Sequence, residues 1–299
     1  MEKCLAFVLG GGGARGALHV GAMRALFENG YKPDLIVGTS IGAANAATLG
    51  WLGVNMDGLS ALEQAYQKVA EAQLMDSPGR LVWHALSGRL YKTSNLARDF
   101  LIAAGITPDL HFDQIKDVRL GLIGAEMISG QPVIFGLDPG QSVLEGVLAS
   151  CAVPPWFAPI ENDDQLIVDG GALSMLPIEP ALNMGATEII ALHLSGSPNH
   201  FTSIHRLDQL EKSISAFTQH EIYLEIALAK ARGVPVHFIS LRNDTPTESW
   251  EFDKYSQMIR NGYEITCREI AGWLKDEQAD SPNFAPIAES QPISTGKTS

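Results

Sequence analysis

Short apolar runs alternate with amphipathic stretches along the chain, and this alternation predicts strands interleaved with helices. The first apolar run, Leu5 to Leu9, is followed by a run of glycines and then by a helical stretch from Ala14 to Asn29. A second run, Leu35 to Val37, leads into an Ala-rich helical stretch that extends to about Leu49. The order strand, helix, strand, helix predicts a parallel sheet covered by helices.

The middle of the chain adds helical cover, a hairpin and further strands. Residues 56–104 have helical spacing and no convincing strand, so they predict helices packed over the sheet. Two apolar runs flank Ser129 to Gln131 and predict a β-hairpin. The apolar runs that predict three later strands are Leu166–Val168, Glu188–Leu194 and Val236–Leu241.

Two long amphipathic helices are predicted in the C-terminal third. The first has an apolar face, interrupted by Glu221, that consists of Leu207, Leu210, Ile214, Phe217, Leu224 and Leu228. The second extends from about Ser249 to Lys275, with an inward face of Phe252, Ile259, Tyr263, Ile270 and Trp273. Residues 276–299 are rich in Ser, Pro, Gln and Thr and predict a disordered C-terminal tail. We therefore expect an α/β fold, three-layer α/β/α with a mainly parallel central sheet, in one domain of residues 1–275.

Charge and cysteine usage exclude some partners and compartments. The chain has 21 Lys and Arg against 34 Asp and Glu, and its net charge of −13 opposes binding to polyanions, so no nucleic acid partner is expected. The 3 cysteines form no C-x-x-C pair, which favours a reducing compartment and indicates no zinc site. The first apolar run is too short for a signal-peptide core, and no run of about 18 apolar residues could span a membrane. These features predict a cytoplasmic protein.

The segment Gly38-Thr39-Ser40-Ile41-Gly42 matches G-x-S-x-G, in which a serine lies on a sharp turn between a strand and a helix. A predicted strand precedes the pattern and an Ala-rich helix follows it, which is the context that this motif requires. The glycines at positions 38 and 42 leave room for the turn. Ser40 is therefore a candidate nucleophile, and a structural serine in a tight turn is the alternative.

A glycine loop, Gly10 to Gly16, lies at the other strand-to-helix junction of the same sheet. The backbone N–H groups of such a loop can approach a negative oxygen, so it could form an oxyanion hole or cradle a phosphate. Gly11, Gly13 and Gly16 also satisfy G-x-G-x-x-G, the dinucleotide-binding fingerprint. That fingerprint needs an acidic residue at the end of the second strand, whereas Asp34 lies before that strand.

A serine nucleophile also needs a base. Asp169, which begins Asp169-Gly170-Gly171, follows an apolar run and is expected at the carboxyl end of a strand, where α/β sites assemble. His193 fits the chain order of an α/β-hydrolase triad, but it and His237 lie inside apolar runs and are expected to be strand histidines. A carboxylate base predicts activity that persists well below pH 6, whereas an unperturbed histidine base would lose activity near pH 6.5.

These three motifs in this order resemble the patatin-like phospholipase family, which has a glycine-rich loop with an arginine before its last glycine, then G-x-S-x-G, then Asp-Gly-Gly. Residues 124–130 resemble the strand-and-turn segment of the family, and residues 149–159 resemble its Ala-Ser-x-Ala-x-Pro run. The resemblance extends from residue 5 to about residue 195. One departure is Glu126, where the family commonly has Asp, and we assign it no role.

The resemblance implies a catalytic domain in residues 1–275 that hydrolyses carboxylic esters of lipids, either phospholipids or lysophospholipids. No metal or cofactor is implied. The reaction would use a dyad in which Ser40 is the nucleophile, forms an acyl-serine intermediate, and has Asp169 as its general base. Backbone N–H groups of Gly11, Gly12 and Gly13 would form the oxyanion hole, and the supporting residues would be Arg15, Gly38, Gly42 and Gly170.

A lipid substrate raises the question of membrane contact. Residues 80–92 are aromatic and locally basic, so the segment of residues 78–92 is a candidate lid that makes transient contact with a membrane surface. Two other functions stay open on the sequence alone. A regulatory or lipid-binding protein could keep this fold with little turnover, and a dinucleotide-binding protein could use the glycine loop.

Overall fold

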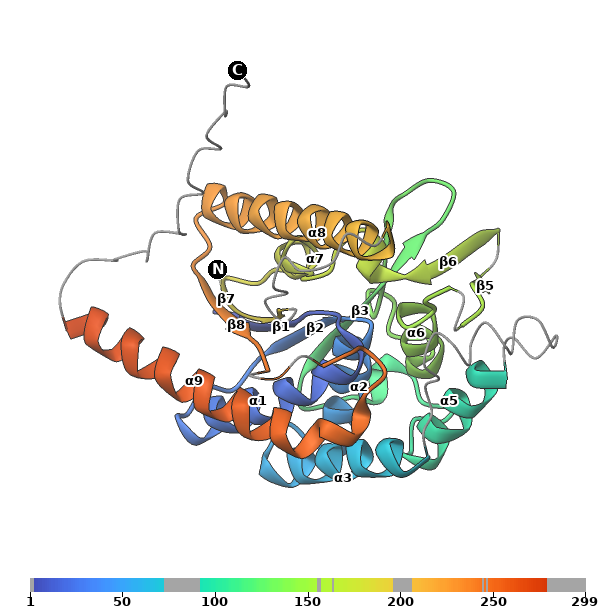
Figure 1. Cartoon of the computed structure of the whole chain (residues 1–299), viewed down its shortest axis with the longest axis horizontal. Helices are drawn as coiled ribbons and strands as arrows, with labels where there is room; N and C mark the ends of the chain where they lie inside the picture. The colour runs from blue at the N-terminus through green and yellow to red at the C-terminus, as the bar shows by residue number, and fades with distance from the viewer. Residues whose placement is uncertain are drawn as a thin grey trace, which may run out of the picture.

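The computed structural model describes residues 3–72, 92–154, 157–162, 164–195, 206–243, 245 and 247–278. These residues form three layers, with a central sheet between two layers of helices (Figure 1). The strands are β1 (Leu5–Leu9), β2 (Leu35–Thr39), β3 (Arg119–Glu126), β4 (Pro132–Phe135), β5 (Ile160–Asn162), β6 (Gln165–Asp169), β7 (Glu188–Leu194) and β8 (Val236–Leu241).

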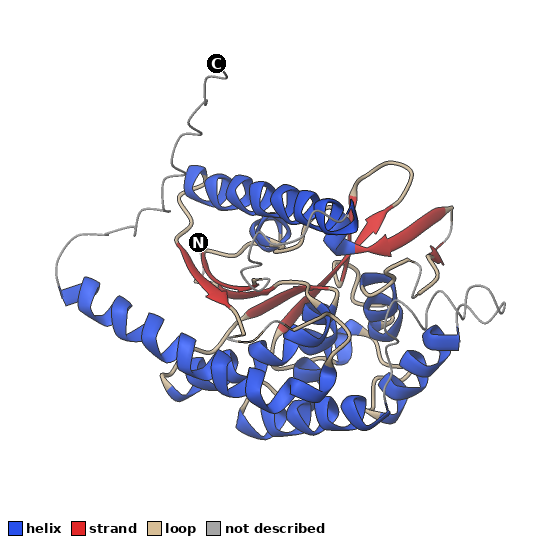
Figure 2. Cartoon of the chain, in the orientation of Figure 1, coloured by secondary structure: helices blue, strands red, loops and turns tan. Residues whose placement is uncertain are grey.

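Within the described residues, eight strands form one sheet in the order β5-β6-β3-β2-β1-β7-β8, with β4 paired to β3. Figure 2 shows the strands in red between helices in blue. Along the series β3-β2-β1-β7-β8 each strand is parallel to its neighbour. Strands β4 and β6 pair antiparallel with β3, and β5 pairs antiparallel with β6. The antiparallel β3–β4 pair is the predicted hairpin. The α/β class and the mainly parallel central sheet predicted from the sequence are thus confirmed.

Helices cover both faces of the sheet (Figure 1). One face carries α1 (Ala17–Glu28), α2 (Ile41–Leu52), α3 (Met56–Ala72), α5 (Lys92–Ala103), α6 (Val143–Ser150) and α9 (Tyr255–Gln278). The other face carries α7 (Ile178–Asn183) and α8 (Arg206–Ala231). Side chains of β1 alternate between the two cores, since Phe7 and Leu9 belong to the first and Ala6 and Val8 to the second.

The C-terminal helix packs against the N-terminal one. A Cβ on Gly21 of α1 would overlap the backbone of Ile259, and a Cβ on Gly262 of α9 would overlap the backbone of Leu18. Two glycines therefore allow the helices to cross at close range. Helix α9 extends to Gln278, so the first three residues of the predicted tail are helical, and residues 279–299 lie outside the described residues.

Where side chains are described, the apolar face predicted for the first long helix is wrong for Phe217 and Leu224, whereas Leu228 packs partly buried against the core as predicted. Phe217 is 73% exposed and Leu224 is 58% exposed, whereas Ile222, Glu225 and Ala229 are buried. The inner face of α8 is therefore rotated toward the side that carries acidic residues, and those residues bond to the loop beneath the helix. The candidate lid at residues 78–92 lies outside the described residues, apart from the backbone of Lys92.

Candidate active site

Ser40 lies on the sharp turn between β2 and α2. It is the only non-glycine residue in the described part of the chain with a positive φ, at 56°. Such strain persists only where surrounding contacts hold it. Here the Ser40 backbone N–H donates to the hydroxyl of buried Ser150 at 2.9 Å, and that hydroxyl donates to the Ile123 carbonyl at 2.6 Å. Ser150, at the end of α6, therefore holds the serine in the geometry expected of G-x-S-x-G.

Gly38 and Gly42 allow this turn to close. A Cβ on Gly38 would overlap the backbone of Gly42, and a Cβ on Gly42 would overlap the carbonyl of Leu9 in β1. The absence of both side chains lets α2 approach the ends of two neighbouring strands. The glycines predicted to support the serine turn therefore have a steric reason to be glycine.

The glycine loop is held on both sides by carbonyl groups from later parts of the chain. The Gly11 N–H donates to the Met175 carbonyl at 2.9 Å, and the Ala14 N–H donates to the Ser249 carbonyl at 2.8 Å. The N–H of Gly11 is therefore already paired with a backbone carbonyl, which favours Gly12 and Gly13 over Gly11 as oxyanion donors. Between these two contacts lie Gly12 and Gly13, which line the same cavity as Ser40.

Arg15 turns back onto the glycine loop. It belongs to the short 3-10 turn Gly13–Gly16 that precedes α1, and its Nε–H donates to the Gly12 carbonyl at 3.2 Å. Its side chain also lines the cavity. Through these contacts Arg15 can support the glycine loop.

Gly13→Ala is expected to lower kcat by about 10²- to 10³-fold, the effect of losing one oxyanion donor. The φ of Gly13 is 59°, and its Cβ would overlap the Ser249 carbonyl, so alanine must displace the loop. Gly130→Ala is the matched control, because Gly130 has a φ of 65° and nothing within 4 Å of its Cβ position. Esterase assays and thermal unfolding of both variants make the comparison. Full activity in Gly13→Ala would remove the loop from the mechanism.

Asp169 ends β6, and the register of the sheet brings it to Ser40. Thr39, immediately before Ser40, pairs with Ile123 of β3, and the next residue, Gly124, pairs with Asp169. The sequence prediction relied on the carboxyl edge of a parallel sheet. Strand β6 is instead antiparallel to β3 and ends at the level of the serine turn. Both Ser40 and Asp169 line one cavity.

Asp169 is 8% exposed. Its Oδ1 accepts the Gly171 N–H at 2.7 Å, whereas Oδ2 is buried without a well-aligned hydrogen bond. Burial raises the pKa of Asp169 to about 6, against smaller opposing effects of the nearby Ser40 hydroxyl and the Gly171 N–H. Catalytic hydrogen bonds are often loose in a free enzyme and tighten when substrate binds. A Cβ on Gly170 would overlap the Ile123 carbonyl, so the turn after Asp169 also needs glycine.

The two candidate histidines lie in strands, as predicted. His193 in β7 stacks on Phe238 with ring centroids 5.8 Å apart, and its Nδ1 is buried without a partner. Burial, and to a smaller extent the charge of Arg15, lowers the pKa of His193 to about 4. His237 in β8 places Nε2 3.3 Å from a carboxylate oxygen of Glu188. Among the described residues that line the cavity there is no histidine.

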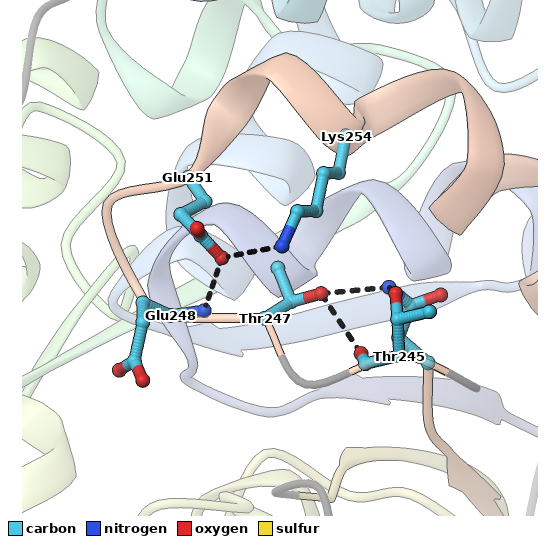
Figure 3. A network of polar contacts seen from close by, with 6 residues as sticks. Thr245, Thr247, Glu248, Glu251 and Lys254 are labelled. Atoms are coloured by element: carbon cyan, nitrogen blue, oxygen red, sulfur yellow. Dashed lines mark hydrogen bonds and ion pairs between the residues drawn. The ribbon is translucent and has the colours of Figure 1, made fainter.

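The segment of residues 247–254, between β8 and α9, is fixed by its own polar contacts (Figure 3). The Asn243 side chain donates to the Thr247 hydroxyl at 2.7 Å. One carboxylate oxygen of Glu251 accepts both the Glu248 N–H at 2.9 Å and the Lys254 ammonium at 2.8 Å. These contacts hold the segment that supplies the Ser249 carbonyl to the glycine loop.

The cavity over Ser40 and Asp169 has a volume of about 560 Å³. Its walls come from α2, α3, α5, α6, the loop that follows α6 and the segment of residues 247–254. They are mostly apolar and include Leu62, Val69, Leu101, Leu148, Phe157 and Trp250. A cavity of this size and character suits an extended apolar ligand.

A polar network lies beside this cavity, one turn beyond Ser40 along α2. The Tyr66 hydroxyl donates to Asn45 Oδ1 at 3.0 Å, and the Asn45 amide donates to the Gly16 carbonyl at 3.0 Å. The amide nitrogen also lies 3.3 Å from Nδ1 of His19, a fully buried ring whose Nε2 donates to a backbone carbonyl of β7. The network ties α1, α2 and α3 together around the serine turn.

The surroundings of the glycine loop do not match a dinucleotide site. The Asp34 carboxylate accepts the N–H of Leu5 at 2.8 Å, which puts it at the beginning of β1, at the opposite edge of the sheet from the loop. Among the described residues, no three His, Cys, Asp or Glu side chains are grouped so that they could hold a metal ion. In the same part of the chain, none of the helices has the length and apolar character needed to span a bilayer.

Several residues of this site have no recognisable signal in the sequence. Met175 and Ser249 act through backbone carbonyls, which carry no residue signature. Trp250 belongs to a segment that comes after all the recognised motifs. Ser150 does lie in the Ala-Ser-x-Ala-x-Pro run, so that run could have suggested a structural role near Ser40.

A mainly parallel sheet, a strained serine after a strand and a buried carboxylate in an apolar cavity are the features of an α/β lipid ester hydrolase. The chain belongs to the patatin-like phospholipase family, since the family model described as "Patatin-like phospholipase" matches residues 7–182.

Curated relatives are similar over parts of their length. Lysophospholipase NTE1 of Meyerozyma guilliermondii is 25% identical over 295 residues, which cover 91% of this chain and 20% of that protein. An uncharacterized NTE family protein of Mycobacterium tuberculosis is 30% identical over 198 residues, covering 64% of this chain and 49% of that protein. The chain thus spans about half of the mycobacterial relative and about a fifth of the yeast relative. The crystal structure of VipD from Legionella pneumophila has 15% identity and a TM-score of 0.46, covering 91% of this chain and 67% of that one.

Proposed function

We propose that this protein hydrolyses carboxylic esters of lipids, with Ser40 as nucleophile and Asp169 as general base. The observation that carries the proposal is that both side chains line one apolar cavity of about 560 Å³. An acyl chain can lie against the apolar walls while its ester carbon reaches the serine. Family membership supports the same class of reaction.

In the first half of the reaction, the Ser40 Oγ attacks the ester carbon while its proton passes to Asp169. The carbonyl oxygen becomes negative, and the N–H groups of Gly12 and Gly13 stabilise it by hydrogen bonds. The tetrahedral intermediate then collapses. Asp169 gives its proton to the leaving alcohol, and the acyl group remains as an ester of Ser40.

In the second half, water replaces the alcohol. Asp169 takes a proton from the water as its oxygen attacks the acyl-serine carbon, and the same backbone N–H groups stabilise the second oxyanion. Collapse releases a fatty acid, and the proton returns from Asp169 to Ser40. The chain's own residues therefore supply the nucleophile, the base and the oxyanion donors.

We propose a phospholipid or a lysophospholipid as the substrate. The relative named as a lysophospholipase supports the single-chain lipid, because its similarity covers most of this chain. Such lipids are presented in membranes or micelles, so the proposal includes transient contact with a lipid surface. A regulatory or lipid-binding protein with little turnover is the second candidate, because an apolar cavity alone can hold a lipid.

The test is release of fatty acid from lysophospholipid in detergent micelles, with EDTA present. We expect multiple turnovers in EDTA and no rise of the melting temperature with NAD or NADP, because a ligand that binds the folded state must stabilise it. Stoichiometric lipid binding without fatty acid release would favour the lipid-binding candidate. Saturable stabilisation by a nucleotide would instead restore the dinucleotide hypothesis.

A further inference from the structure

The loop between Gly170–Ala172 and α7 contacts both halves of the proposed site. Its Met175 carbonyl accepts the Gly11 N–H at 2.9 Å. Its Ser174 carbonyl accepts the hydroxyl proton of Thr39 at 2.9 Å, next to Ser40. The position of this loop therefore affects the glycine loop and the serine turn together.

Two glutamates of α8 hold this loop from the other face of the sheet. Glu225 Oε1 accepts the Ser174 hydroxyl at 2.5 Å, and Oε2 accepts the Glu179 N–H at 2.8 Å. The second bond satisfies a backbone donor at the beginning of α7, where no side-chain cap of its own is present. Glu221 lies one turn earlier on α8, and its Oε2 is 3.4 Å from the Met175 N–H.

Burying acidic side chains in this position lowers the free energy of unfolding unless hydrogen bonds compensate. Glu225 is only 8% exposed. Burial, followed by the hydrogen bond and charge of Glu225, raises the pKa of Glu221. A helix that only needed to cover the sheet could bury apolar residues here at lower cost. The polar contacts instead fix backbone groups of the loop in one arrangement.

We propose that Glu225 is a positioning residue for the oxyanion site of this hydrolase. Glu225 holds the Ser174 hydroxyl and the first turn of α7 by hydrogen bonds. This keeps the neighbouring Met175 carbonyl in place, where it accepts the Gly11 N–H. The N–H groups of Gly12 and Gly13 follow directly in the chain. The proposal rests on the proposed function for its catalytic consequence, but the chain of hydrogen bonds from α8 to Gly11 exists independently of turnover.

The experiment compares Glu225→Leu, Glu225→Gln and the control Gln219→Leu in the full-length protein. Gln219 is exposed on the same helix, so its variant adds the same side chain without touching the loop. Displacement of catalytic groups by about 1 Å can cost about 10²-fold, so we expect Glu225→Leu to lower kcat by about that factor with KM nearly unchanged. Glu225→Gln keeps an acceptor for the Ser174 hydroxyl and should retain more activity. Gln219→Leu should match the unmodified protein.

Hydrogen exchange of the Gly11 amide provides a readout that does not depend on turnover. We expect Glu225→Leu to exchange this amide about tenfold faster or more, with a smaller increase in Glu225→Gln and none in Gln219→Leu. Unchanged kcat and unchanged Gly11 exchange in a destabilised Glu225→Leu would overturn the inference, because Glu225 would then only attach α8. If the unmodified protein released no fatty acid, the proposed function would fail, and the exchange rates would still decide whether Glu225 positions the loop.

Discussion

Ser40→Ala is expected to lower esterase activity by about 10⁴-fold or more, because it removes the hydroxyl proposed to carry the acyl group. Folding should be preserved, since alanine keeps the backbone N–H that donates to Ser150. The melting temperature can even rise, because a strained active site costs stability. Fatty acid release and circular dichroism of the purified variant make the measurement.

Ser60→Ala is the matched control for this variant. Ser60 lies exposed on α3, and its hydroxyl donates only to the Met56 carbonyl one turn earlier. It should keep full activity. Retention of activity in Ser40→Ala, with the protein folded, would mean that the serine turn is structural.

Asp169→Asn is expected to reduce turnover by about 10²- to 10⁴-fold, the usual contribution of a general base. Asparagine keeps the size of the side chain and can still accept the Gly171 N–H, so the turn after β6 should persist. His193→Gln is the informative comparison, because its ring is buried, uncharged at neutral pH and outside the cavity lining. Loss of activity in folded His193→Gln equal to that in Ser40→Ala would contradict the dyad.

The pH dependence follows from the burial of Asp169. Because its pKa is raised to about 6, the base becomes protonated as the pH falls through about 6, and kcat/KM should fall with it. The sequence alone predicted activity well below pH 6, and the burial of Asp169 moves the expected loss of activity up to about pH 6. A histidine base would also lose activity near pH 6. The Asp169→Asn and His193→Gln variants therefore distinguish an aspartate base from a histidine base better than the pH profile of kcat/KM does.

The raised pKa of Asp169 also predicts how Asp169→Asn changes the stability of the protein. A carboxyl group whose pKa is higher in the folded protein than its ordinary value of 3.8 opposes folding once it is ionised. Its cost grows as the pH rises from about 4 to 6 and is complete at pH 7, where it amounts to at most about 3 kcal/mol. Asp169→Asn should therefore be as stable as the unmodified protein at pH 4 and more stable at pH 7, which denaturant unfolding can measure.

Local patterns predicted the fold and the serine turn well, because their causes lie within a few neighbouring residues. The G-x-S-x-G segment specifies a strand, a tight turn and a helix through its own glycines, and Ser40 takes the strained conformation that this pattern implies. The alternation of apolar runs likewise indicated the parallel strands. Both kinds of signal depend on residues close together in sequence.

Features that depend on distant residues were predicted less well. The Gly11 N–H is used by the Met175 carbonyl, a contact between residues far apart in sequence. The inner face of α8 contains Glu225 because its partners are polar groups of another loop, which helical spacing cannot indicate. Asp169 was expected beside Ser40 because the carboxyl ends of parallel strands meet at one edge of a sheet. Its strand β6 is instead antiparallel to β3.

A fluorophosphonate probe mapped by peptide mass spectrometry tests whether Ser40 is an activated nucleophile. Such probes react with serines that have a base and an oxyanion site beside them. We expect one modified peptide, labelled at Ser40, with labelling lost in Ser40→Ala and slowed in Asp169→Asn. Labelling at another serine while Ser40 stays unmodified would contradict it.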